Sequence, residues 1–186
     1  MILNRSSLRS DFPKAGLFGS KVLLIPFCAE DISIQYISWL QDHNVLRFSN
    51  QRFFEHNIES SHKYLASFAQ TDNLFLSLRN LEDGCAIGTM TAYASLHHGT
   101  VDMGILIGDR RVWSRGLGQD AWNILLNWLL CNPRVRKVTA GCAIGNMGMV
   151  RLMKKSGMLY EATLYKQELI DGKPHDIVYY ARFRDE

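Results

Sequence analysis

The stretch from Gly108 to Ala121, GDRRVWSRGLGQDA, concentrates residues that bind anions. Gly116 and Gly118 stand just before Gln119 to Leu130, an apolar segment with the spacing of a buried helix. Glycine has no Cβ, so backbone N–H groups at such a helix start can approach a ligand closely, and the helix dipole favours negative charge there. Guanidinium groups beside the glycines would bind phosphate, and the loop supplies three of them: Arg110, Arg111 and Arg115.

This Gly-X-Gly pattern is open to three interpretations. It could be a structural strand-to-helix turn that binds nothing. It could be a dinucleotide fingerprint, since Gly116-x-Gly118-x-x-Ala121 formally fits GxGxxA. That fingerprint normally follows the first strand and precedes an acidic residue by about 20 positions, whereas this loop follows a third or fourth strand and the next one, Lys137 to Ala143, has no carboxylate. The third interpretation is a different phosphate-bearing ligand, held together with the neighbouring elements.

The elements that position this loop follow from hydrophobic periodicity and turn signals. Asp31 is expected to cap the first helix, Gly157 to end the last one, and Asp171-Gly172 to form a hairpin turn. The order predicts a mixed α+β protein with a mostly antiparallel central sheet flanked by helices. Residues 1–20 are expected to be an irregular N-terminal segment and 21–186 a single domain. Strands are predicted at 21–27, 74–79, 86–93, 101–107, 137–143, 160–169 and 177–183, and helices at 32–41, 59–68, 119–130 and 147–155.

The composition narrows the class of partner. The chain has 186 residues, 47% hydrophobic and 21% charged, with a net charge of +3. These values are ordinary for a soluble globular protein and argue against nucleic acid as a partner. No segment reaches the roughly 20 apolar residues that span a bilayer, so we expect no membrane insertion and a cytoplasmic location. The four cysteines form neither a CxxC pair nor a Cys/His cluster at zinc spacing, so we expect reduced thiols and no metal site.

The strand Val101–Ile107, the glycine loop and the following helix resemble the acetyl-CoA-binding core of the GCN5-related N-acetyltransferases (GNAT). That family's signature is Q/R-x-x-G-x-G/A between a central strand and a helix, and it is present here as Trp113 to Gly118. Trp113 departs from the usual Gln or Arg. The departure is similar to loops of the subgroup that resembles ribosomal-protein N-terminal acetyltransferases.

Three other segments extend this resemblance over most of the chain from about residue 21. Asn146 to Met158 resembles the family's N-x-x-(S/A)-x-R-(L/V)-x-(E/K)-K-x-G-F segment. Asp171 to Tyr180 is similar to a hairpin near the end of that subgroup, and Trp39 to Asp42 to its W-L-x-D helix end. The resemblance implies the GNAT fold and acetyl-CoA as cofactor.

The resemblance also implies which residues bind the cofactor. The pyrophosphate would meet backbone groups of the loop: Ser114, Arg115, Gly116, Leu117, Gly118 and Gln119. The pantetheine arm would pair, like an added strand, with the backbone of Ile105, Leu106 and Ile107. Asn146 would contact the arm, cap the helix that starts at Met147, or do both. The remaining phosphate would bind some of four cations, each of which could equally be a surface charge: Arg110, Arg111, Lys154 and Lys155.

Acetyl transfer to an amine needs a proton acceptor and a partner for the departing thiolate. The resemblance offers two acidic candidates for the base, Asp102 on the central strand and Glu161, although either could form a cross-strand ion pair instead. The family's usual tyrosine acid and the subgroup's serine are replaced by Met153 and Met149. Either water protonates the sulfur, or another hydroxyl reaches in from Tyr93, Tyr160 or Tyr165.

The acceptor side is predicted from the aromatic and polar segment 47–56, where the family builds its acceptor wall. The predicted acceptor-binding residues are Phe48, Asn50, Gln51, Tyr93 and His97, the last of which could instead lie in a surface turn. We expect an N-acetyltransferase whose acceptor is a small molecule such as a nucleotide-linked amino sugar. A protein N-terminal amine is the alternative within that class, and a non-catalytic acyl-CoA sensor is the alternative outside it. The sequence leaves a homodimer open.

Overall fold

A computed structural model describes residues 7–184, and its centre is a sheet of eight strands. Their order across the sheet is β1-β2-β3-β4-β5-β6-β8-β7, and every neighbouring pair is antiparallel except β5 and β6. The mixed α+β architecture with a mostly antiparallel sheet is therefore confirmed. The strands are β1 (Leu17–Phe18), β2 (Val22–Pro26), β3 (Leu74–Asn80), β4 (Ala86–Ser95), β5 (Thr100–Ile107), β6 (Lys137–Ala143), β7 (Leu159–Ile170) and β8 (Lys173–Phe183).

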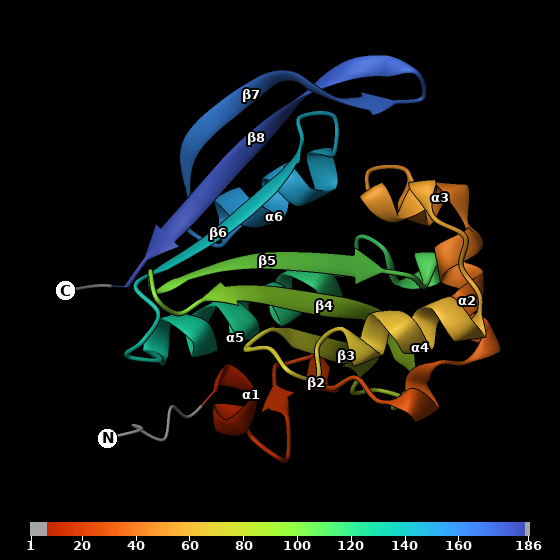
Figure 1. Cartoon of the computed structure of the whole chain (residues 1–186), viewed down its shortest axis with the longest axis vertical. Helices are drawn as coiled ribbons and strands as arrows, with labels where there is room; N and C mark the ends of the chain where they lie inside the picture. The colour runs from red at the N-terminus through yellow and green to blue at the C-terminus, as the bar shows by residue number, and fades with distance from the viewer. Residues whose placement is uncertain (1–6, 185–186) are drawn as a thin grey trace.

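Helices cover both faces of the sheet (Figure 1). One face packs against α1 (Leu8–Asp11), α5 (Leu117–Cys131) and α6 (Met147–Lys155) in the main core. The other face carries a smaller core built with α2 (Ile34–Gln41), α3 (His43–Leu46) and α4 (Ile58–Ala66). Three short 3-10 turns complete the chain: η1 (Ala29–Asp31), η2 (Asn50–Phe53) and η3 (Arg110–Val112). Within the described residues, no helix is long and apolar enough to cross a membrane.

Strand β3 shows why the sequence accepts helices on both sides. Leu74, Leu76 and Leu78 alternate into the main core, while Phe75 points to the opposite face and stacks on Phe27 with ring centroids 4.2 Å apart. A strand that is buried on both faces reads as a continuous apolar run rather than an alternating one.

The feature that matters most for function is the separation of β5 from β6. These parallel strands pair only over Thr100–Asp102 and Lys137–Thr139 and then diverge, as Figure 1 shows. The last part of β5, Met103 to Ile107, therefore has β4 on one side and no strand of the described chain on the other. This splay leaves backbone hydrogen-bonding groups of a central strand open to a ligand.

The prediction that Asp31 caps the first predicted helix was wrong. Asp31 does not cap α2, because Ser33 does so by accepting a hydrogen bond from the Tyr36 N–H. Asp31 lies in η1 instead, where its buried carboxylate pairs with Arg79 at 2.7 Å and accepts a hydrogen bond from Ser77. An acidic residue this buried needs such partners.

The N-terminal segment was predicted to be irregular, and over the part described this is incorrect. Residues 1–6 lie outside the described range. Leu8 to Asp11 forms a helical turn capped by Ser7, and Leu17–Phe18 pairs with β2. Leu8 is fully buried and Phe12 packs edge-on against Trp128, so apolar anchors in a polar stretch hold this segment to α5.

Candidate active site

The glycine loop ends in a helix start with free backbone donors. Gly116 caps α5 with φ of 84°, a left-handed conformation that favours glycine. The first hydrogen bond of the helix runs from the Asp120 N–H to the Gly116 carbonyl at 3.0 Å. The N–H groups of Leu117, Gly118 and Gln119 therefore have no partner inside the helix. Such a group of donors at the positive end of a helix dipole is an anion site.

Gly118 differs from Gly116 because nothing in the described part of the chain requires glycine there. A Cβ added at Gly118 would lie 3.6 Å from the Ile107 side chain, an ordinary van der Waals contact. Its missing side chain instead leaves room beside the free N–H groups.

The register of β5 shows which of its backbone groups face the splay. The Gly108 N–H donates to the Ile87 carbonyl at 2.9 Å, on the β4 side, and β4 pairs Thr89 with Leu106. Because backbone groups alternate along a strand, those of Leu106 bond to β4, while those of Ile105 and Ile107 face the splay. The prediction that Leu106 offers its backbone to a ligand is therefore wrong. Leu106 instead lines a pocket between β5, η2 and α4.

Trp113 joins the loop to this strand. Its indole Nε1–H donates a hydrogen bond to the Ile107 carbonyl at 2.9 Å. The indole therefore uses the carbonyl of Ile107 but not its N–H. Arg110 stacks over the indole at 5.7 Å and pairs with Asp42 at 3.4 Å. The sequence marked Trp113 only as a departure from the signature. It holds the loop on the end of β5.

The candidate phosphate-binding cations are not equally available. Arg111 is paired with Asp109 through several hydrogen bonds, and Arg110 is committed to Asp42 and the indole. Arg115 is exposed, and no ion pair to it is found in the described part of the chain. Lys21, which the sequence did not single out, donates to the Arg115 carbonyl at 3.1 Å and lines a cavity of about 480 Å³ beside the loop.

The C-terminal end of helix α6 contacts the first turn of α5, directly after the glycine loop. The Gln119 side chain donates to the Ser156 hydroxyl at 2.6 Å, so only its backbone is directed to the loop. Lys154 and Lys155 form the exposed last turn of α6 next to this contact. Asn146 caps α6 by accepting from the Met149 N–H at 3.2 Å, which is the structural role the sequence allowed for it. Its contact with a cofactor stays a prediction.

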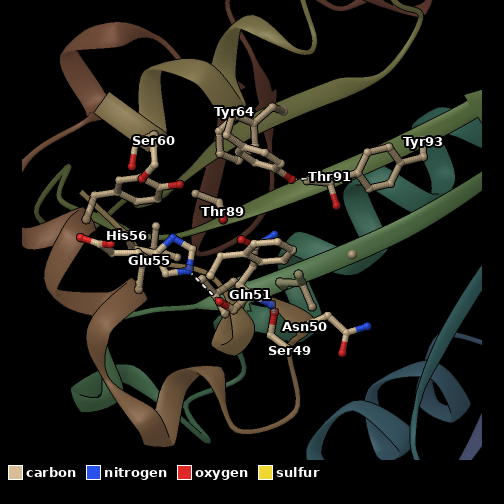
Figure 2. Close-up of a pocket in the computed structure, with 18 residues that line it drawn as sticks. Ser49, Asn50, Gln51, Glu55, His56, Ser60, Tyr64, Thr89, Thr91 and Tyr93 are labelled. Atoms are coloured by element: carbon tan, nitrogen blue, oxygen red, sulfur yellow. Dashed lines mark hydrogen bonds between the residues drawn. The ribbon is translucent and has the colours of Figure 1, made fainter. Parts of the chain in front are cut away.

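A pocket opens between η2, α4 and the strands β4 and β5 (Figure 2). It has a volume of about 620 Å³ and reaches from η2 and α4 to Ile105 on β5. Of the predicted acceptor residues, Asn50, Gln51 and Tyr93 line it. Phe48 lines a neighbouring pocket of about 260 Å³, and Asn50 borders both. The prediction for His97 is wrong, because this residue lies in the exposed turn between β4 and β5, at the end of β5 opposite Ile105.

Hydroxyl groups gather in this pocket. Ser61 is buried, with 4% of its surface exposed, and its hydroxyl has no hydrogen-bond partner among the described residues. Buried polar atoms without partners are rare, and the surrounding atoms cover this hydroxyl oxygen from the pocket. The Tyr64 and Tyr93 hydroxyls lie 2.7 Å apart, and burial raises the pKa of Tyr64, which keeps it neutral.

Of the three tyrosines that the sequence offered for the thiolate, only Tyr93 lines the pocket. Tyr160 and Tyr165 are exposed on β7, where Tyr160 hydrogen-bonds Thr163 instead. Met153 is fully buried in the core, and its side chain has no hydroxyl to offer the thiolate.

The two candidate carboxylates have different environments. Asp102 opens into the smaller pocket and accepts a hydrogen bond from the Thr139 hydroxyl at 2.8 Å. The residue is exposed at the surface, but the neighbouring strands exclude part of the water around its carboxylate, and this desolvation raises its pKa. Glu161 forms an ion pair with Lys137. Lys137 and Thr139 alternate onto one face of β6, so both acids lie on that face. Glu161 thus has the cross-strand ion pair that the sequence allowed as its alternative.

Replacing Asp102 by asparagine is expected to raise the melting temperature at pH 7. Because the folded chain raises this pKa above its ordinary value of 3.8, the stability conferred by the neutral carboxyl is complete below that pH and is lost as the pH rises through the folded pKa. The asparagine side chain would remain neutral at all pH values and could still accept from Thr139. Thermal unfolding of both proteins at pH 3.5 and pH 7 checks this.

The difference in melting temperature should vanish at the lower pH. Glu161→Gln is the matched control, since losing the ion pair with Lys137 should not stabilise the chain. Equal melting temperatures for Asp102→Asn and wild type at pH 7 would show that desolvation of this carboxylate costs nothing.

Comparison with solved structures supports the fold. The microcin C7 self-immunity acetyltransferase MccE, solved with acetyl-CoA and AMP, aligns with a TM-score of 0.80 and 16% identity over 92% of this chain and 98% of its own. The ribosomal L7/L12 alpha-N-protein acetyltransferase RimL, solved with coenzyme A, aligns with a TM-score of 0.79 and 13% identity over 89% and 96%. The spermidine N-acetyltransferase of Vibrio cholerae, solved with CoA and spermine, aligns with a TM-score of 0.78 and 15% identity over 89% of this chain and 96% of its own.

At these identities the likeness establishes the fold and leaves the acceptor open. The family follows from the sequence itself, because residues 21–159 match the model of the acetyltransferase (GNAT) domain. This range includes the splayed strand, the glycine loop and the first turn of α5. The predicted family and fold are confirmed, and the chain belongs to the GNAT acetyltransferases.

Proposed function

We propose that this acetyltransferase moves the acetyl group of acetyl-CoA to a primary amine of a small molecule. One observation carries the proposal: the open edge of β5 adjoins both the start of α5, where Gly118 lies beside the Ile107 side chain, and the pocket of about 620 Å³, which we call the acceptor pocket. The edge and the pocket share Ile105, which faces the splay with its backbone and borders the pocket.

The residues present fit acetyl-CoA. Its diphosphate matches the free donors of Leu117, Gly118 and Gln119, and the amides of its arm match the edge groups of Ile105 and Ile107. Three cations around the loop are suited to its remaining phosphate: Lys21, Arg115 and Lys155. When bound, acetyl-CoA would supply an acetyl group activated as a thioester.

The acceptor pocket suits a compact amine. Its volume of about 620 Å³ lies within the range typical of small-molecule sites. No arginine or lysine of the described chain lines it, so the diphosphate of a nucleotide-linked sugar would find no cationic partner there. Its lining includes a carboxylate, Glu55, which favours a cationic acceptor. A protein N-terminus remains the alternative, since it would have to insert only its first residue.

The test is release of free thiol from acetyl-CoA with a panel of small amines, amino sugars and peptides. We expect turnover with small primary amines and little with peptides. Binding of acetyl-CoA without turnover on any acceptor would instead identify a sensor that retains the cofactor groove.

Ser61→Ala is expected to leave the KM for the acceptor and the affinity for acetyl-CoA within two-fold of wild type and to stabilise the fold by about 1 kcal/mol. The variant removes a buried hydroxyl that has no partner in the described chain and that the surrounding atoms cover from the pocket. Its stability should be higher, because an unsatisfied polar group disappears. Steady-state kinetics and thermal unfolding measure both effects.

Ser60→Ala is the matched control. Ser60 also lines the pocket, but its hydroxyl completes the capping box of α4 with Asn57. This variant should lose stability, by about 1 kcal/mol. A lower melting temperature for Ser61→Ala than for wild type would show that the Ser61 hydroxyl does have a partner in the folded protein.

A further inference from the structure

We propose that His56 is the general base of this enzyme and that its Nδ1 atom takes the proton from the acceptor nitrogen. The inference rests on the proposed function and assigns a residue that the sequence placed only within the acceptor segment. His56 follows η2, lines the pocket, and is half-buried. Figure 2 shows its ring beside Gln51 and Glu55, below Thr89.

The tautomer of His56 is fixed by its surroundings. Its Nε2 lies 2.7 Å from the Gln51 carbonyl oxygen, which can only accept a hydrogen bond. The proton of the neutral ring therefore resides on Nε2, and Nδ1 keeps its lone pair. No group among the described residues forms a hydrogen bond with Nδ1.

The backbone of His56 is held as well. Gln41 at the end of α2 donates from Nε2 to the His56 carbonyl at 2.9 Å. The hydrogen bond at Nε2 fixes the ring, and the hydrogen bond at the backbone carbonyl fixes the main chain of His56. Together they hold Nδ1 in one direction, as a general base requires.

The other titratable groups that line the pocket serve this role less well. Burial raises the pKa of Tyr36 and Tyr64, so both stay protonated. The Tyr93 hydroxyl forms a hydrogen bond with the Tyr64 hydroxyl. Glu55 is exposed and forms no hydrogen bond with the ring in the described chain. Asp102 opens into the smaller pocket and is bonded to Thr139.

The proton balance is simple. The neutral amine forms a C–N bond to the acetyl carbon while the C–S bond breaks and its electron pair leaves on sulfur. Nδ1 takes the proton that the nitrogen loses, and the resulting imidazolium returns it to the sulfur directly or through water. Amine and thioester thus become amide and thiol, and His56 ends neutral.

The experiment compares His56→Gln with His62→Gln. Glutamine keeps an N–H donor near the position of Nε2 but has no base at Nδ1, and His62 is an exposed histidine of α4 outside the pocket. For His56→Gln we expect kcat to fall about 100-fold, as for loss of a general base, with acetyl-CoA affinity within two-fold of wild type. His62→Gln should behave as wild type.

A second variant separates a base from a structural residue. Imidazole added to His56→Ala should restore part of the rate. Without imidazole, this variant should lack the rise of kcat/KM with pH that we expect for wild type. A kcat for His56→Gln within three-fold of the wild-type value would overturn this inference and leave the proposed function standing. A wild type that turns over no amine would overturn the proposed function, and this inference with it.

Discussion

Gly118→Val is expected to weaken acetyl-CoA binding about 100-fold or more while the chain stays folded. The γ-methyl groups of valine would cover the free N–H groups at the start of α5, and hydrogen bonds to a charged ligand are worth about 1.5–3 kcal/mol each. Folding should survive, because a Cβ at this position meets the Ile107 side chain at an ordinary 3.6 Å. Calorimetric titration with acetyl-CoA measures the affinity and thermal unfolding the fold.

Gly118→Ala is the control for this prediction. Its single methyl group fits the same space, and alanine is preferred to glycine inside a helix by up to about 1 kcal/mol. This variant should bind within a few-fold of wild type and melt no lower. Undiminished binding by Gly118→Val would show that the diphosphate lies elsewhere.

Proline at two adjacent positions of β5 should affect different properties, ligand affinity at one position and stability at the other. Ile105→Pro removes an N–H that faces the splay, so the sheet should remain intact and acetyl-CoA affinity should fall about ten-fold. Leu106→Pro removes an N–H on the side that pairs with Thr89 of β4, in mid-sheet. It should destabilise the fold by about 1–3 kcal/mol, because a buried hydrogen bond of the sheet is lost and its acceptor is left unpaired.

Chemical unfolding of the two variants, followed by titration of the folded one with acetyl-CoA, checks this pair. If both variants unfold equally, the edge of β5 does not behave as an open edge. If Ile105→Pro binds as tightly as wild type, the arm of the cofactor does not pair with this strand.

The geometry of the glycine loop could be predicted from sequence because its determinants are local. Gly116 has the positive φ that glycine permits, and the helix after it begins within two residues of the expected position. The turn at Asp171-Gly172 was equally readable, with φ of 50° and 72°. Such features depend on neighbouring residues in the chain, which a pattern records.

Features that depend on distant partners were not readable. Leu106 looked equivalent to its neighbours, since only the register with β4 decides which way its backbone faces. The ion pair of Glu161 depends on Lys137, on another strand. His56 gave no sequence signal for a base, because its role depends on the Gln51 carbonyl that fixes its tautomer. Ser61 was missed because an absent partner is visible only in a fold.

Residue-resolved amide hydrogen exchange with and without acetyl-CoA tests the central claim most directly. The claim is that the open edge of β5 and the start of α5 together hold this molecule. Acetyl-CoA should slow exchange at Ile105, Ile107, Leu117, Gly118 and Gln119, and should leave Leu106, already paired with β4, nearly unchanged. Protection confined to other segments, or none at saturating acetyl-CoA, would contradict the account.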